Sequence, residues 1–105
     1  MKTTDAAVIC KALGDTNRLQ ILQLLFNGEM CACDLLEHFD LSQPTLSYHM
    51  KILTDCALVD SKKSGKMNHY TINCKTLNKY KRFIEGLDCS KTKTDTSCAC
   101  RTEKQ

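Results

Sequence analysis

The strongest constraint on how this chain folds is a helix that begins almost as soon as the previous one ends. Apolar spacing predicts a helix that ends near Phe39, and Asp40-Leu41 then leaves room only for a tight turn. Ser42 is a good N-cap, and Pro44 falls in the first turn of the next helix, where its missing N–H costs little. That helix, predicted over residues 42–56, carries its apolar side chains on one face: Leu46, Met50 and Leu53. Two helices joined in this way are typical of a helix-turn-helix.

The rest of the chain predicts further helices and one β-hairpin around this pair. Helices are expected over residues 6–13, 15–26, 31–39 and 75–87, and strands over 58–63 and 67–72, joined by Ser64-Gly65. The expected buried stripes are Ala6, Ile9, Cys10 and Leu13 in the first helix, Leu19, Leu22, Leu25 and Phe26 in the second, Leu35, Leu36 and Phe39 in the third, and Leu77, Tyr80 and Ile84 in the last. This order predicts a mostly α fold with a small β-hairpin, a winged helix-turn-helix.

Length and charge indicate one domain with a basic central segment. A chain of 105 residues is the size of a single domain, and we expect the folded part over residues 1–87 and a flexible, cysteine-containing tail over 88–105, which lacks apolar periodicity. Residues 41–87 hold eight Lys and Arg against three Asp and Glu, whereas residues 1–40 hold three against six. This asymmetry is a mild sign of a polyanionic partner. With no apolar run of 18 residues and no signal-peptide pattern, we expect no membrane association and a cytoplasmic location.

The outward face of the helix over residues 42–56 has the polar groups that a DNA-reading helix needs. A major groove admits one helix, and base edges are read by hydrogen-bond donors and acceptors. The side chains predicted to contact DNA from this helix are Ser42, Gln43, Thr45, Ser47, Tyr48, His49 and Lys51, with His49 at the boundary of the apolar face. A hydrophilic helix face alone is more often simply solvated. The preceding helix, the tight turn and the basic hairpin together favour DNA.

The predicted hairpin carries three lysines around its glycine turn. Lys62, Lys63 and Lys66 would reach backbone phosphates beside the groove that holds the reading helix. Lysines also protect exposed strands from edge-to-edge aggregation. Each single lysine therefore fits either role.

Eight cysteines in so short a chain predict either a disulfide framework or a site for soft ions. The missing export signal and the helical patterns around the cysteines favour the ion site, and Cys31-Ala32-Cys33 is its sharpest candidate. Residues i and i+2 of a regular helix point about 200° apart, so these thiols share an ion only if the helix start distorts. Because a short turn separates this helix from the DNA-reading one, that distortion would move the DNA-reading surface. Two half-buried structural cysteines are the alternative interpretation.

The remaining cysteines carry weaker signals. Cys10 lies on the apolar stripe of the first helix, and Cys56 and Cys74 lie at element ends, so we interpret all three as core or incidental thiols. Cys89 and the pair Cys98-Ala99-Cys100 fall in the expected tail, which could fold back and supply one more thiolate or remain uncommitted. No histidine–carboxylate metal pattern, phosphate loop or nucleophile–base arrangement is legible, so we expect no enzyme activity.

Several of these motifs together resemble the arsenic-repressor (ArsR/SmtB) family of bacterial metal-responsive repressors. The similarity runs from about residue 6 to residue 87. It is carried by Ala12-Leu13-Gly14-Asp15 with Arg18-Leu19, by Glu29-Met30-Cys31-Ala32-Cys33-Asp34-Leu35, by the block from Leu41 to Leu53, and by Gly65-Lys66 and His69-Tyr70.

The resemblance implies a homodimer built from the first and last helices and an inverted-repeat operator on double-stranded DNA. It implies Cys31 and Cys33 as ligands of arsenite or antimonite, with cadmium or lead as the alternative inducers; the last helix lacks the pattern of the family's zinc sensors. Many arsenite sensors of this type have a third cysteine where this chain has Leu36, so a third thiolate would come from Cys10, Cys89, Cys98 or Cys100. A thiol redox switch remains a rival with the same fold, and a small thiol oxidoreductase a distant one.

Overall fold

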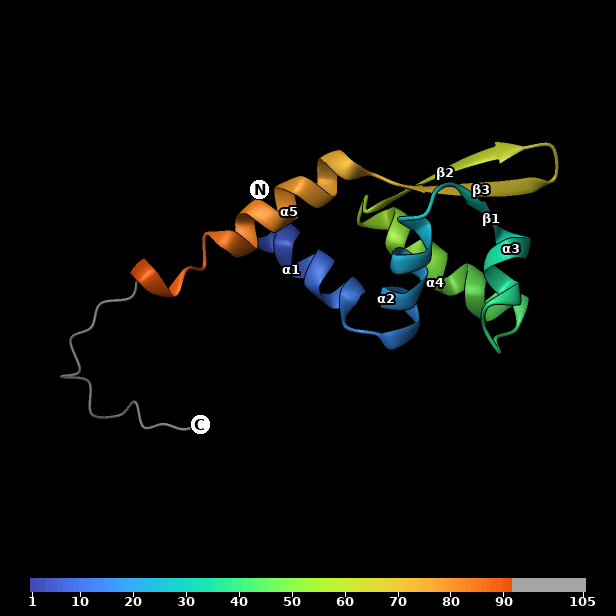
Figure 1. Ribbon diagram of the computed structural model, residues 1–105, viewed down its shortest axis with the longest axis horizontal. Coiled ribbons are helices and arrows are strands. Elements are labelled where there is room, and N and C mark those ends of the chain that lie inside the picture. Colours follow the sequence, from blue (N-terminus) through green and yellow to red (C-terminus); the bar gives the residue numbers. More distant parts are fainter. Residues whose placement is uncertain (92–105) are drawn as a thin grey trace.

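The computed structural model describes residues 1–91, and the predictions made for Cys98 and Cys100 lie outside that range. Figure 1 shows the arrangement of its helices and of a small sheet that extends away from them. The elements, in chain order, are α1 (Thr3–Leu13), α2 (Thr16–Leu25), β1 (Met30–Cys31), α3 (Ala32–Glu37), α4 (Gln43–Asp55), β2 (Val59–Ser64), β3 (Met67–Ile72), α5 (Cys74–Glu85) and a short 3₁₀ turn, η1 (Cys89–Lys91). The mostly α winged helix-turn-helix expected from the sequence is confirmed. No helix within residues 1–91 combines the length and apolar character needed to span a bilayer.

The helices start where side chains can accept the free N–H groups of the first turn. Asp15 caps α2 by accepting from the Arg18 N–H at 3.1 Å, and Ser42 caps α4 by accepting from the Thr45 N–H at 3.3 Å. Asn73 caps α5 in the same way. These caps fix the order of elements locally, which is why the sequence predicts most helix starts correctly.

The sheet has three antiparallel strands in the order β1-β3-β2. The β2–β3 hairpin turns at Gly65, whose φ of 63° is the left-handed conformation that glycine adopts without strain. Strand β1 was not predicted. It pairs Met30 with Tyr70 and Cys31 with His69, so the segment that precedes α3 is attached to the hairpin by main-chain pairing.

The core lies between α1, α2, α4 and the base of the hairpin. Its fully buried large side chains are Ile9, Ile21, Leu35, Leu46, Met50, Leu53, Leu58 and Val59. The predicted stripe of α4 is confirmed, but that of α2 is partly wrong. Leu19 and Phe26 are exposed, while Ile21 is fully buried beside Leu22 and Leu25. Helix α2 is apolar on several sides, and only its contacts with α4 and β3 decide which side faces inward.

The two ends of the described chain meet, because α1 lies beside α5 in Figure 1. Cys10 was expected in the core of α1, but it is exposed. Its Sγ lies 3.2 Å from the Tyr80 hydroxyl of α5, and this bond raises the pKa of Tyr80. Ala12 takes the inward position instead, because the inward face of α1 follows Ala6, Ile9 and Ala12.

Candidate functional site

Helix α4 presents a continuous polar face to solvent over its first two turns. The exposed side chains include six of the seven predicted for DNA contact from this helix: Ser42, Gln43, Thr45, Ser47, Tyr48 and Lys51. The ring of Tyr48 is 61% exposed although it is large and aromatic. An exposed ring with a hydroxyl at its tip, flanked by small hydroxyl side chains, fits the shape and hydrogen-bonding pattern of a groove edge.

Two of these residues are already engaged within the helix. The Ser42 hydroxyl donates to Thr45 Oγ1 at 2.9 Å while it caps the helix, and Lys51 Nζ lies 3.2 Å from the Asp55 carboxylate. Both members of the Lys51–Asp55 pair are well exposed, so the pair is worth little and can be exchanged for a phosphate contact.

His49 is placed differently from the other predicted DNA contacts. The sequence set it at the boundary of the apolar face, but only 6% of its surface is exposed. Its Nδ1 lies 3.0 Å from an Arg18 guanidinium nitrogen, and Arg18 Nε donates to the Ala12 carbonyl at 2.6 Å. Arg18 therefore links the end of α1, the start of α2 and the middle of α4. The buried ring of His49 holds the reading helix in place and does not reach outward.

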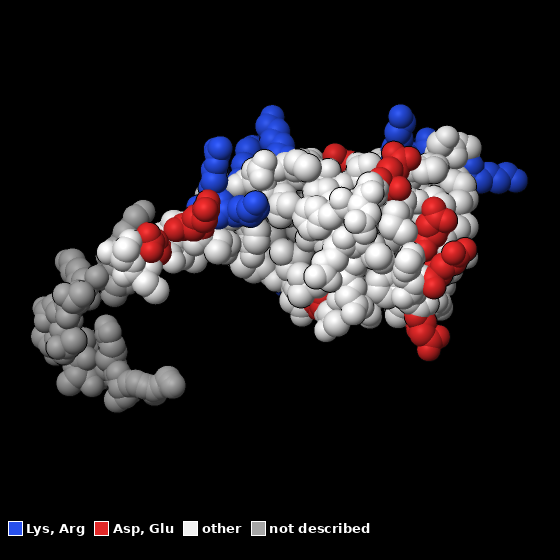
Figure 2. Space-filling view, in the orientation of Figure 1, with Lys and Arg blue, Asp and Glu red and all other residues white. Residues whose placement is uncertain are grey.

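The hairpin carries its lysines outward. Lys62 and Lys63 of β2 pair with His69 and Asn68 of β3, and both lysines, like Lys66 in the loop, are exposed. Figure 2 shows basic side chains gathered over α5 and the hairpin, and acidic ones gathered at the end of the molecule where α3 lies. The surface therefore has a basic edge suited to phosphates.

Cys31 and Cys33 lie at the start of α3, as predicted. Cys31 is the N-cap residue, in an extended conformation, and its Sγ accepts from the Asp34 N–H at 3.4 Å. Cys33 is exposed in the first turn of the helix, and its Sγ lies 4.0 Å from Met67 Sδ of β3. Cys31 thus lies outside the regular helix, where the backbone can turn its thiol toward that of Cys33 with little loss of helical hydrogen bonding.

The other described cysteines are not gathered around this pair. All six cysteines in residues 1–91 are free thiols, and no three His, Cys, Asp or Glu side chains within that range form a metal-binding group. Figure 1 places α3 at one end of the molecule, and α1 and the turn that holds Cys89 at the other. Of the third thiolates considered above, Cys10 and Cys89 are therefore remote from Cys31 and Cys33 within one chain.

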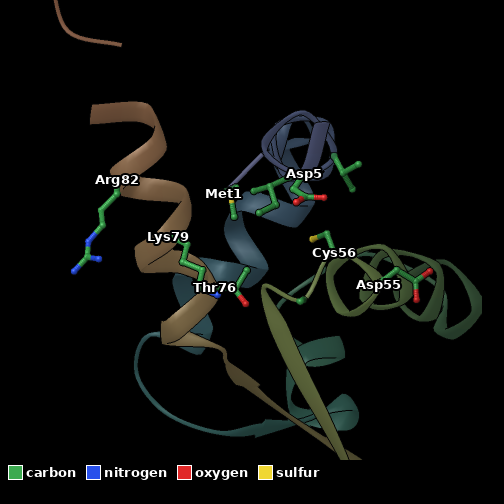
Figure 3. Close-up of a pocket in the computed structure, with 10 residues that line it drawn as sticks. Met1, Asp5, Asp55, Cys56, Thr76, Lys79 and Arg82 are labelled. Carbon is green, nitrogen blue, oxygen red and sulfur yellow. The ribbon is translucent and has the colours of Figure 1, made fainter. Parts of the chain in front are cut away.

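A cavity of about 630 Å³ lies between α1, the end of α4 and α5. Figure 3 shows Cys56 turned toward this cavity and Arg82 extending away from it. Burial raises the pKa of the Cys56 thiol, which keeps the sulfur protonated and unreactive. Around the cavity α1 and α5 expose apolar side chains, notably Val8, Ile84 and, just beyond α5, Leu87.

Comparison with known proteins gives a consistent match. The family model described as bacterial regulatory protein, arsR family, matches residues 15–61. An arsenical resistance operon repressor from Staphylococcus xylosus is 44% identical over 104 residues, which cover 99% of this chain and 96% of that protein.

Solved structures agree with the sequence match. An ArsR-like transcriptional regulator from Rhodococcus sp. RHA1 superimposes with a TM-score of 0.73 at 29% identity, covering 83% of this chain and 82% of that one. A homodimeric winged helix-turn-helix DNA-binding domain from Mycobacterium bovis, a possible ArsR-family regulator, gives 0.67 at 25% identity, covering 83% and 82%.

Proposed function

Since this chain belongs to the arsR family of bacterial regulatory proteins, we propose that it is a homodimeric repressor that leaves its operator when arsenite or antimonite binds Cys31 and Cys33. The observation that carries this proposal is the position of the two thiols. They flank the start of α3, one short turn before the helix that presents Ser47 and Tyr48 to solvent. The near full-length similarity to an arsenical resistance operon repressor supports the choice of ion.

The operator is read by α4 and held by the hairpin. Gln43, Ser47 and Tyr48 are the groups proposed to meet base edges, and Lys62, Lys63 and Lys66 those proposed to meet phosphates. His49 is left out of this set because its ring is buried against Arg18. A homodimer places two such helices on the two halves of an inverted repeat, and the apolar side chains of α1 and α5 are its proposed contact surface.

Release follows from the geometry at α3. Cys31 caps the helix with its sulfur, so drawing that sulfur into a shared site with Cys33 removes the cap from the Asp34 N–H. The start of α3 must then rearrange, and both β1 and the turn before α4 are attached to it. An ion that binds this rearranged form more tightly than the DNA-bound form shifts the equilibrium toward free protein.

The decisive experiment replaces Cys31 and Cys33 together by serine. Serine is a good N-cap, so the double variant keeps the start of α3 and should bind operator as the unmodified protein does. Hydroxyls are poor ligands for a soft ion, so arsenite should no longer release it. Fluorescence anisotropy of a labelled operator, with arsenite titrated into the complex, measures both properties.

The matched control is the double variant C74S/C89S, which removes two exposed thiols far from α3. It should respond to arsenite as the unmodified protein does. If the C31S/C33S variant still leaves DNA on adding arsenite, the ligands lie elsewhere. Cadmium or lead acting at lower concentration than arsenite would change the inducer and keep the repressor, and release by peroxide alone would establish a redox switch.

A further inference from the structure

A third sulfur atom lies beside the paired thiols, and it belongs to the hairpin. Met67 is the first residue of β3, and its Sδ lies 4.0 Å from Cys33 Sγ, although 34 residues separate the two in the chain. Thioether sulfur is a soft donor and, with thiolate, is among the ligands that soft ions select.

Strand register brings Cys31 to the same place. Cys31 is paired with His69 in the β1–β3 ladder, and directly paired residues have their side chains on one face of a sheet. Met67 is two residues from His69 on β3, so it lies on that same face, diagonal to Cys31. Diagonal neighbours in antiparallel strands are within reach of long side chains. Three sulfur atoms from α3 and the hairpin therefore face one small region.

That region borders the proposed DNA surface. A cavity of about 170 Å³ lies between α3, the start of α4 and β3, and Cys33, Met50 and Met67 supply sulfur to its walls. The same cavity is lined by Gln43, Ser47 and Lys66, which are proposed DNA contacts. A ligand held by these sulfurs touches both the reading helix and the hairpin.

We propose that the Met67 thioether is the third soft donor of the ion site, completing the set begun by Cys31 and Cys33. The inference rests on the proposed function for the identity of the ion. Arsenous acid, As(OH)₃, reacts with the two thiols to form two As–S bonds and releases two water molecules, leaving one hydroxyl on arsenic. The thioether adds a lone pair with no proton lost and no change of oxidation state.

This assignment gives ion binding a direct route to the hairpin. Without an ion, β1 is joined to β3 by main-chain pairing and by the His69–Glu29 contact at 3.2 Å. With an ion bound to sulfur from both sides, α3 and the tip of the hairpin are fixed to one another. The position of Lys66, directly before Met67, then depends on the ion as well as on DNA.

The test compares M67L with M30L in the full chain. Leucine keeps the apolar volume of methionine and removes only the sulfur. Met30 is the matched control, because it lies on the neighbouring strand and packs on the core. Arsenite affinity, measured by direct titration of the protein alone, should fall at least about tenfold in M67L and stay unchanged in M30L.

A second measurement does not depend on affinity. The chain has four methionines, so ¹³C-methyl labelling of methionine gives four signals that single leucine variants assign. One equivalent of arsenite should shift the Met67 signal most and leave Met1 unmoved. Equal affinity in M67L and unmodified protein, with an unmoved Met67 signal, would overturn the assignment. Because both readouts use protein without DNA, failure of arsenite to release operator would count against the proposed function alone.

Discussion

Replacing His49 by leucine tests how the reading helix is held. The ring is 6% exposed, and its Nδ1 is the partner of an Arg18 guanidinium nitrogen at 3.0 Å. Leucine fills similar space and removes the acceptor, which leaves a charged donor without its partner. Such a loss costs about 1.5–3 kcal/mol when the donor is fully buried, and because Arg18 is only half-buried we expect about 1–2 kcal/mol.

Urea unfolding of the full chain, followed by circular dichroism, measures this loss of unfolding free energy. His49→Asn is the matched variant, because its side-chain carbonyl can take the place of Nδ1 and should recover part of the loss. Operator affinity should fall in the leucine variant with an unchanged salt dependence, since no phosphate contact is removed. A leucine variant as stable as the unmodified protein, but with weak operator binding, would refute the clamp and restore the direct DNA contact expected from the sequence.

Three further predictions concern the exposed residues and one cap. Tyr48→Ala should weaken operator binding by about 1–3 kcal/mol while binding to random DNA, measured in the same anisotropy assay, changes little; equal losses on both would mean that Tyr48 only positions the backbone. Lys63→Gln should lower the slope of log affinity against log salt by roughly 0.9 per binding site, and an unchanged slope would return this lysine to a solubilising role. The backbone N–H of Arg18 holds the pKa of Asp15 below its usual value, so the stability gained from this carboxylate is present at neutral pH and is lost as pH falls through the lowered pKa. Asp15→Asn should therefore remove part of the acid sensitivity of unfolding; an unfolding profile with the same pH dependence would contradict the capping role.

Local signals made most of the fold predictable. Ser42 and Pro44 set the start of α4, and Gly65 sets the hairpin turn, through interactions within a few residues of each. Strand β1 was missed because two residues carry no periodicity, and only pairing with β3 makes them a strand. The inward side of α2 was misjudged at Leu19 and Phe26 for a similar reason, since the packing partners decide it.

The candidate site was predictable in part. The spacing of Cys31 and Cys33, together with the resemblance, located the thiols at a helix start. Nothing in the spacing indicated Met67, because its proximity depends on the β1–β3 register. His49 was misplaced because its partner, Arg18, lies 31 residues earlier, and a helix pattern cannot show that a polar ring at a boundary position has a buried partner.

Helix α5 has a consequence for how the protein behaves on dilution. It contains no fully buried residue within a single chain, and it is held mainly by half-buried Leu77 and Tyr80 and by the Cys10 contact. In the proposed homodimer the second copy covers its exposed apolar side, so part of the free energy that keeps α5 folded comes from association. The midpoint of thermal unfolding should then rise with protein concentration, as mass action requires when assembly and folding are linked. Amide hydrogens of α5 should exchange faster than those of α4 once the copies separate, because α4 alone has its own buried core contacts.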